Sequence, residues 1–280
     1  MKKVMIWLTL AWMVSAGWAQ TKTSFTYRYE PGQTYRYLMV ADIKMVMDMS
    51  GRNFETTSTG RMLISLKAVE RNSDGDLSFE AWYDSLTISI KSMQMDTTMV
   101  LSDLLGKRAK LVVSQYGRTK SLTAIDSLDG NPMVQRVLNN DPHIYLRRLL
   151  SDLPDQPMAP GDKWTNTQKD TTKQANMQIV VEPAIEYTLA GTETVNGDPC
   201  SRFILAGPLS LTGKGNQMGA DFFIEGDGTT NGFLLYNEQK GILTAVEGSS
   251  EQVTSIAISG GANMTMSQTQ TMHHKLSLLP

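Results

Sequence analysis

The chain has few of the residues on which catalysis and disulfide bridging depend. Its 280 residues include one cysteine, Cys200, and three histidines, His143, His273 and His274. A single cysteine excludes an intrachain disulfide, and a free thiol is usually buried. Nucleophilic catalysis requires a nucleophile beside an oriented base, and no spacing in the sequence joins Cys200 or His274 to such a base. We therefore predict that the protein is not an enzyme, with catalysis through Cys200 or His274 as the minor alternative.

Metal sites also lack their usual patterns. His273 and His274 are neighbours, so on a strand they point to opposite faces, and no cysteine or acidic residue stands at a zinc spacing from them. The oxygen-rich segment 72–76 lacks the longer loop and terminal glutamate of an EF-hand calcium site, so a hairpin turn is the stronger interpretation. We expect His274 to be a core histidine whose polar atoms are satisfied. No metal and no cofactor are expected.

Nucleotides and nucleic acids are not expected as partners. The glycine-rich segments 213–216 and 226–228 do not follow a strand and open a helix, as a phosphate-binding loop does, and both are interpreted as loops. The formal net charge is −2, and basic residues are spread along the chain rather than clustered.

Only one long apolar run is present, from Val4 to Val14. It follows Met1-Lys2-Lys3 and precedes Gly17-Trp18-Ala19, which is the pattern of a signal peptide. The run is shorter than the roughly 20 residues that cross a bilayer as a helix, so a retained anchor is the weaker alternative. Because no cysteine stands at the cleavage point, a lipid anchor is not expected. We predict a periplasmic or secreted protein that does not span the membrane after cleavage.

Alternation with a period of two dominates the remaining sequence and predicts long β-strands. From Tyr35 to Met49 the odd positions are apolar or aromatic, and from Met264 to Leu278 the even positions carry Met, Gln, His or Leu. The Asp74-Gly75 pair between two alternating runs predicts a hairpin. The apolar positions change from odd to even at Asp84-Ser85, which indicates a bulge or a corner in a bent sheet.

The second half of the sequence repeats turn motifs of the first. Pro160-Gly161 echoes Pro31-Gly32, and residues 194–198 echo the turn at 72–76. Similar turn chemistry can produce such echoes by chance, but their near-constant spacing favours a duplication. The predicted organisation is a signal peptide at 1–19, a first β half at 20–125, a helical connector at 126–155 and a second β half at 156–280, in one structural unit.

The connector between the halves has a helical period. Asn131-Pro132 and Asp141-Pro142 are helix start signals, and two short amphipathic helices are predicted before Pro154. Their apolar side chains are candidates for a lid over the sheet: Val134, Val137, Leu138, Leu146 and Leu149.

Methionine is present in excess, with 18 copies. Its flexible, polarizable side chain suits a cavity for apolar ligands of different shapes, although it fills irregular cores equally well. A curved sheet encloses volume on its concave side beyond what its own side chains fill, so we predict an apolar ligand cavity there. The candidate ligand-binding residues are Met39, Met45, Met47, Met62, Met264, Met266 and Met272.

Together with the signal peptide, the segments 31–35, 153–164 and 193–197 resemble those of a family of exported bacterial β-proteins of unknown function. These motifs are structural, so the resemblance implies an exported β-protein and brings no activity or site residue. Long strands with interposed helices are also similar to the half-barrel of periplasmic lipoprotein carriers such as LolA, whose concave apolar face holds acyl chains. This second similarity is an analogy of fold alone.

We therefore predict a mainly β protein, a long antiparallel curved sheet or partly open barrel built from two similar halves with short helices between them. The predicted function is exported, non-enzymatic binding of an apolar ligand, a lipid or an acylated molecule, in a curved-sheet cavity. The alternative is a structural or protein-interaction module of the cell envelope that docks an envelope protein partner.

Overall fold

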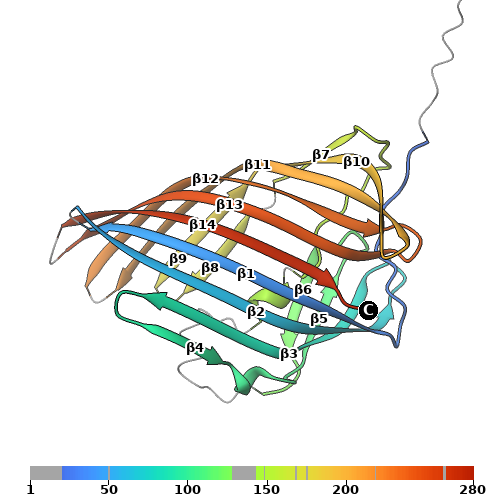
Figure 1. Cartoon of the computed structure of the whole chain (residues 1–280), viewed down its shortest axis with the longest axis horizontal. Coiled ribbons are helices and arrows are strands. Elements are labelled where there is room, and N and C mark those ends of the chain that lie inside the picture. The colour runs from blue at the N-terminus through green and yellow to red at the C-terminus, as the bar shows by residue number, and fades with distance from the viewer. Residues whose placement is uncertain are drawn as a thin grey trace, which may run out of the picture.

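The computed structural model describes residues 21–49, 51–127, 143–147, 149–167, 169–174, 176–217, 219–260 and 263–280. These residues form one large sheet of antiparallel strands (Figure 1). The sheet does not close into a barrel, because the strands at the two ends of its path do not pair with each other. The predicted fold class, a mainly β protein with a long curved and open sheet, is confirmed.

Most neighbouring strands are consecutive in sequence, as in a meander, and β1 pairs with β14 where the two halves meet. The order across the sheet is β6-β5-β3-β2-β1-β14-β13-β12-β11-β10-β7, with β4 beside β3, β9 beside β11 and β8 beside β9. The strands are β1 (Thr34–Met49), β2 (Arg52–Arg71), β3 (Leu77–Ser92), β4 (Asp96–Val100), β5 (Ala109–Val113), β6 (Thr119–Ala124), β7 (Lys163–Asn166), β8 (Asp170–Gln174), β9 (Met177–Pro183), β10 (Ile185–Val195), β11 (Asp198–Gln217), β12 (Ala220–Asn237), β13 (Ile242–Ser259) and β14 (Met264–Leu278). The described helical elements are the 3₁₀ turn η1 (Ser102–Leu104) and the single helical turn α2 (Ile144–Arg147).

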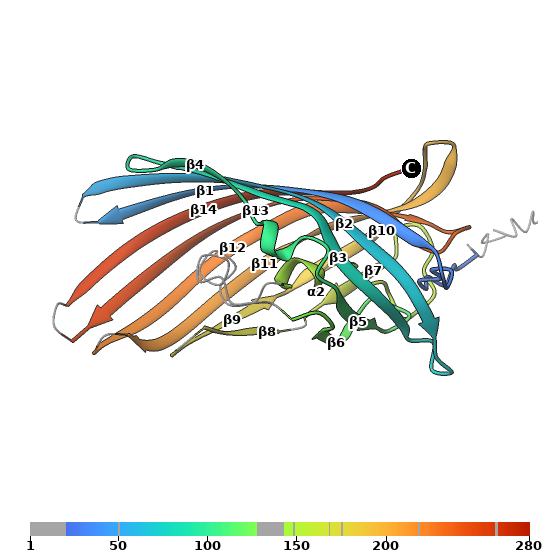
Figure 2. The same ribbon diagram turned by 90° about the horizontal axis from the view of Figure 1, so that it is seen from below.

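The sheet has the form of a trough. In Figure 2 it bends from β4 and β1 at the top through β14, β13 and β12 to β9 and β8 at the bottom. Strands of up to 20 residues, as in β2 and β11, must twist and bend in this way because they far exceed the usual five or six residues. α2, β5 and β6 lie at one end of the trough, which we call the packed end. At the opposite, open end, β1 connects to β2 and β13 connects to β14.

The two faces of the sheet differ in chemistry. We call inner the face that carries Tyr37, Met62 and Ile64, because these fully buried side chains belong to the core. Directly opposed residues of antiparallel strands point to the same face, so the strand register assigns the other paired residues to a face. The outer face of β13 and β14 is mostly polar, with Glu247, Ser249, Glu251, Ser255, Ser267, Thr269, Thr271, His273 and Lys275, and it also carries the exposed Val253.

The core fills the packed end, where residues 23–29 connect strands that are distant in the sheet. Tyr27 N donates to Gln115 O at 2.8 Å in the β5–β6 turn, and Arg28 N donates to Gly241 O at 2.7 Å in the β12–β13 turn. Phe25 contacts Phe203 edge to face, with ring centroids 4.9 Å apart. This N-terminal segment therefore ties the two halves of the trough together at its packed end.

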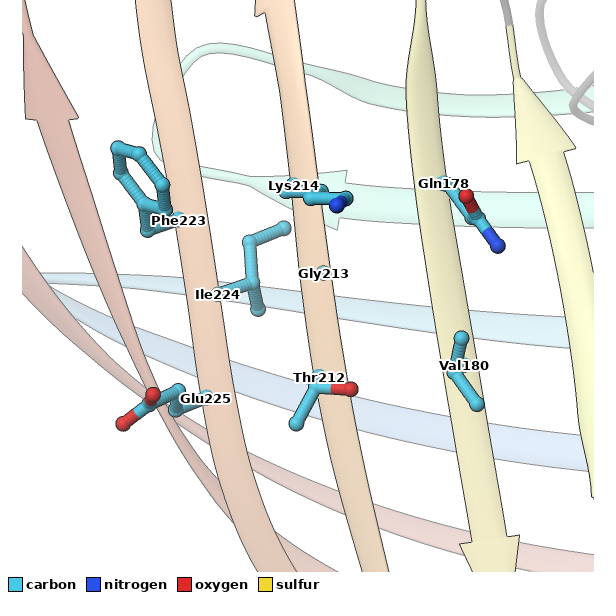
Figure 3. A pocket seen from close by; sticks show the side chains of 8 residues that line it. All are labelled: Gln178, Val180, Thr212, Gly213, Lys214, Phe223, Ile224 and Glu225. Atoms are coloured by element: carbon cyan, nitrogen blue, oxygen red, sulfur yellow. The ribbon is translucent and has the colours of Figure 1, made fainter.

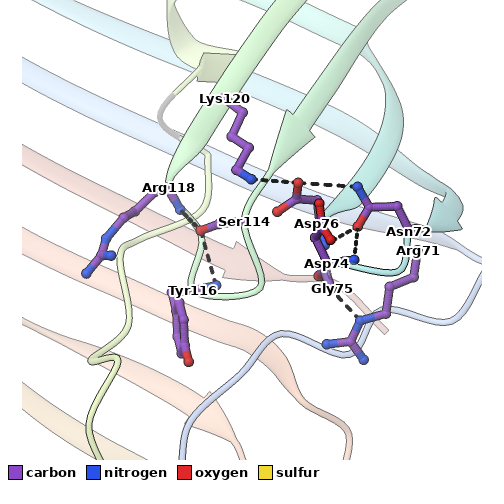
Figure 4. A network of polar contacts seen from close by, with 9 residues as sticks. All are labelled: Arg71, Asn72, Asp74, Gly75, Asp76, Ser114, Tyr116, Arg118 and Lys120. Atoms are coloured by element: carbon purple, nitrogen blue, oxygen red, sulfur yellow. Dashed lines mark hydrogen bonds and ion pairs between the residues drawn. The ribbon is translucent and has the colours of Figure 1, made fainter.

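The turn between β2 and β3 is built around the side chain of Asn72 (Figure 4). Its Oδ1 accepts hydrogen bonds from Asp74 N at 3.0 Å and Asp76 N at 2.9 Å, and Gly75 has a φ of 82°. Lys120 Nζ donates to Asp76 Oδ2 at 2.6 Å, which joins the turn to β6 and lowers the pKa of Asp76. The predicted hairpin is confirmed, and these polar side chains serve the turn.

The predicted bulge is also confirmed. The register of β2 and β3 shifts where Leu63 faces Ser85 and Ile64 faces Tyr83, so Asp84 is the extra residue. Asp84 Oδ2 accepts a hydrogen bond from Ser65 Oγ at 2.6 Å, and its Oδ1 accepts one from Trp82 Nε1 at 2.8 Å. Because of this extra residue, the apolar positions of β3 change from odd to even numbers, and their side chains stay on the inner face.

The prediction that segments 213–216 and 226–228 are loops is wrong. Both lie inside long strands, where Gly213 of β11 pairs with Ile224 of β12, and Gly228 of β12 pairs with Leu209 of β11. The curvature leaves little room on the inner face, since a Cβ on Gly228 would lie 2.4 Å from the carbonyl oxygen of Glu251. Glycine permits this close approach of neighbouring strands.

The two halves of the sheet have the same order of strands. The series β6-β5-β3-β2-β1 of the first half corresponds strand by strand to the series β13-β12-β11-β10-β7 of the second half. Glycines with positive φ stand at equivalent connections: Gly32 and Gly161, Gly75 and Gly197, Gly117 and Gly241. A meander needs no repeat to have this order, so the duplication and the domain boundaries stay predictions. The predicted signal peptide and the whole of the predicted first connector helix lie outside the described residues.

Candidate functional site

The two alternating runs found at opposite ends of the sequence form one surface. β1 and β14 pair along their whole length, and Ala41 faces His274, Ile43 faces Met272, and Met45 faces Gln270. The odd positions of β1 and the even positions of β14 therefore share the inner face. The curved sheet brings this surface together with the inner faces of β12, β11 and β9.

The methionines of the described strands all lie on this face. Every methionine in the named strands lies on the inner side according to the register, because each is opposed to another inner residue or continues the same alternation. No methionine of these strands lies on the outer side. The inner methionines are Met39, Met45, Met47, Met49, Met62, Met99, Met177, Met264, Met266 and Met272.

The predicted ligand-binding residues divide into two zones. Met62 is fully buried, and Met39 is packed against the core, so both belong to the packed end. The other candidates are only partly buried and continue toward the open end: Met45, Met47, Met264, Met266 and Met272. Apolar side chains of the facing strands show the same partial exposure: Ile179, Val181, Leu209, Leu211, Ile256 and Ile258.

Two of the predicted lid residues belong to the core. Leu146 and Leu149 are 0% and 1% exposed and pack at the packed end. Thr119 Oγ1 donates to Arg147 O at 2.7 Å, and Tyr27 OH donates to Ser151 O at 2.8 Å, so this segment is fixed to the sheet and to the N-terminal segment. Val134, Val137 and Leu138 lie outside the described residues. The role of a lid stays a prediction.

A polar strip that was not predicted from the sequence lies within the inner face. We use this name for Ser250, Gln252 and Thr254 of β13 with Gln268, Gln270 and His274 of β14. The register pairs Gln252 with Gln270 and Thr254 with Gln268, so these side chains lie side by side on the floor of the trough. The sequence sign of this strip is the series of polar residues at the even positions of 250–254. Because Ser, Gln and Thr stand there, they weaken the apolar alternation by which a strand is recognised.

Two atoms of the polar strip lack partners. Across the described residues, the buried atoms Gln252 Nε2 and His274 Nδ1 make no hydrogen bond. Leaving a buried polar group unpaired costs about 1–3 kcal/mol. His274 lies on the inner face as expected, but the prediction that its polar atoms are satisfied is wrong for Nδ1, because the opposed residues Ala41 and Gly248 offer no side-chain donor or acceptor. Burial, followed by the charge of His273, lowers the pKa of His274.

A shallow pocket of about 380 Å³ lies on β9, β11 and β12 near the open end (Figure 3). Most of its lining side chains belong to the outer face, since Lys214 pairs with both Gln178 and Phe223, and Thr212 pairs with Glu225. Phe223 is 53% exposed there. This pocket is therefore separate from the methionine-rich inner face.

Cys200 is buried, as predicted for a free thiol. Its Sγ lies 3.6 Å from Thr244 Oγ1, and burial raises the pKa of the thiol. Over the described ranges, no three side chains of His, Cys, Asp or Glu gather in a way that would hold a metal ion. In the same part of the chain, no helix is long and apolar enough to cross a membrane.

No family model matches the chain, and no curated protein matches it. Among solved structures, one of lipid–protein interactions in lipovitellin aligns with 90% of this chain at 12% identity and a TM-score of 0.43, and this chain spans only 26% of that one. An outer membrane channel from Pseudomonas putida F1 aligns with 93% of this chain and 100% of its own at 9% identity and a TM-score of 0.29. OccK5 (OpdH) from Pseudomonas aeruginosa aligns with 89% of this chain and 99% of its own at 5% identity and a TM-score of 0.28. These values support no assignment of function, and the similarity to LolA-like carriers stays an analogy.

Proposed function

We propose that this is an exported, non-enzymatic protein that binds an apolar ligand, a lipid or an acylated molecule, against the inner face of the trough at its open end. The observation that carries the proposal is the confinement of the strand methionines to one face, together with the partial exposure of those beyond the packed end. A core residue would be fully buried, as Met62 is. Partly exposed methionines on a concave surface instead suit an apolar ligand of adaptable shape.

The polarity of the two faces supports a ligand inside the trough. A sheet that spans a bilayer turns apolar side chains outward and polar ones inward. Here the arrangement is reversed, because the outer face of β13 and β14 carries Glu247, Glu251 and Lys275 while the inner face carries Met264, Met266 and Met272. The apolar side is the one that a curved sheet encloses.

A pair of adjacent substitutions on β14 tests the proposal. Met266→Glu places a charge on the inner face, whereas Ser267→Glu places the same charge on the exposed outer face of the next residue. Delipidated protein is mixed with a fatty acid, a phospholipid and an acylated peptide, and the melting temperature is measured. We expect a ligand-dependent increase for the parent chain and Ser267→Glu, and its loss in Met266→Glu. No shift with any of the three probes would contradict the proposal.

A second candidate function is docking of an envelope protein on the outer face, because three large apolar side chains are exposed there. Ile204, Phe223 and Val253 are 46%, 53% and 52% exposed. Phe223→Ser would then remove a stoichiometric partner from pull-downs of native envelope extract, while Met266→Glu would leave it bound.

A further inference from the structure

We propose that the ligand of the inner face is an uncharged amphiphile of the monoacylglycerol type, whose hydrogen-bonding group lies on the polar strip and whose acyl chain lies against the methionine side chains. This inference rests on the function proposed above and names the class of ligand.

The absence of charge on the inner face of β1, β12, β13 and β14 favours an uncharged ligand on the polar strip, although Arg52 lies on the inner face at the exposed start of β2, opposed to Met49. Among the described inner residues of β1, β12, β13 and β14, none is Asp, Glu, Lys or Arg. The charged residues of these strands lie on the outer face, where Lys275 Nζ and Glu247 Oε2 are 3.4 Å apart. An ionised headgroup on the polar strip would lose its hydration without gaining a counter-ion from these four strands, which is strongly unfavourable.

The unpaired atoms favour a ligand that forms hydrogen bonds. Gln252 Nε2 is a donor, and His274 Nδ1 is a donor or an acceptor depending on the tautomer. A pure hydrocarbon would leave both atoms unpaired, whereas hydroxyl and ester groups would pair with them. The lowered pKa of His274 is consistent with a neutral imidazole that exchanges hydrogen bonds with neutral groups.

Small residues stand directly opposite the two unpaired groups of the polar strip. On the inner face Gln252 is opposed by Gly228, and His274 stands between Ala41 and Gly248. Ala41, His274 and Gly248 belong to one row of directly opposed inner residues, which also includes Gly60 on β2 and Gly232 on β12. Across these five neighbouring strands, His274 has the only long side chain in the row. Larger apolar residues begin one row further toward the open end, with Ile43 and Met272.

The experiment compares three amphiphiles that share a dodecyl-length chain and differ in the charge of the headgroup: 1-monolaurin, laurate and dodecyltrimethylammonium. Binding to the delipidated protein is measured by calorimetry below the micellar concentrations, at about pH 8, where histidine is neutral. We expect 1-monolaurin to bind at least about tenfold more tightly than either charged probe.

Two variants test whether the headgroup lies on the polar strip. Gln252→Leu and His274→Leu each remove one unpaired group, so we expect the affinity for 1-monolaurin to fall about fivefold while the melting temperature of the ligand-free protein rises. A merely structural role would lower the melting temperature and leave the affinity unchanged. His273→Leu is the matched control, because His273 is the neighbouring residue on the outer face. It should leave the affinity unchanged.

The outcomes separate this inference from the proposed function. Equal binding of the three probes, or unchanged affinity in both variants, would overturn the uncharged headgroup and its position while apolar binding remained established. No binding of any probe would overturn both.

Discussion

The hydroxyl groups of Tyr29 and Tyr37 lie 2.6 Å apart and form a closed set of hydrogen bonds with the backbone of Leu243. Tyr37 OH donates to Leu243 O at 2.9 Å, and Leu243 N donates to Tyr29 OH at 3.3 Å, so Tyr29 OH is left to donate to Tyr37 OH. Both rings are fully buried in the core, and burial raises the pKa of both phenols. Residues 23–29 and β1, which are close in sequence, are therefore joined to the remote strand β13 by buried polar contacts at the packed end.

Tyr37→Phe should destabilise the protein by about 1–3 kcal/mol, because it leaves Leu243 O and Tyr29 OH without their partner inside the core. Urea denaturation measures the free energy of unfolding. Tyr35→Phe is the control, since Tyr35 OH only accepts a hydrogen bond from Glu30 N at 3.1 Å at an exposed position. We expect it to cost about 0.5 kcal/mol or less. Equal losses in the two variants would contradict the role of the buried set.

The strands and their faces were predictable from the sequence, whereas their partners were not. Alternation in residues 35–49 and 264–278 identified two strands with an apolar face, because the period of a strand is a local property. That these two strands pair with each other is a contact between the two ends of the chain, and no local pattern specifies it. The methionines could therefore be assigned to one predicted cavity, but the pairing of β1 with β14 that brings them together could not be predicted.

The main error in the predicted fold was the interpretation of glycine-rich strand segments as loops. Gly226, Gly228 and Gly232 share parity with Ile224 and Leu234, so they continue the inner face of β12. Glycine usually marks a turn, and that interpretation concealed its second use, the close approach of strands in a curved sheet. A glycine series with a period of two inside an apolar alternation is the signal that would have identified the curvature.

Adding a methyl group at two of the inner glycines should have opposite effects. In Gly232→Ala the new Cβ would lie 2.2 Å from the carbonyl oxygen of Glu247, so the backbone must shift, and we expect a loss of about 1–3 kcal/mol or more. In Gly60→Ala the nearest atom is Met62 Cε at 3.1 Å, the end of a flexible side chain. Because alanine also restricts the unfolded chain, this variant should match or slightly exceed the parent in stability. Denaturation midpoints that fall equally in both variants would contradict this account of the curvature.

His274 should make the stability depend on pH. Because burial, and then His273, lower the pKa of His274 in the folded chain, the unfolded chain takes up its proton first as the pH falls through about 6.5. The free energy of unfolding therefore decreases as the pH falls below about 6.5, and this contribution is fully present above that pH. His274→Gln should lose less stability than the parent between about pH 8 and about pH 5. His273→Gln keeps His274 and its burial, the larger cause of the lowered pKa, so it should stay closer to the parent than His274→Gln does. Parallel curves for all three proteins would argue against a neutral His274 in the folded chain.

Oxidation of methionine provides a direct map of the proposed ligand surface. Sulfoxide formation follows the exposure of the thioether, so in the ligand-free protein Met93, which is 82% exposed, should react fastest and Met62, which is 0% exposed, slowest. The partly exposed Met266 and Met272 should react at intermediate rates. A ligand in the trough would cover these two sulfurs and leave Met93 free, so 1-monolaurin should slow oxidation at Met266 and Met272 several-fold without a change at Met93. Peptide mass spectrometry after timed peroxide treatment measures each rate. Protection of Met93 as well would indicate a general effect of the lipid on the peroxide, and unchanged rates at Met266 and Met272 would place the ligand elsewhere.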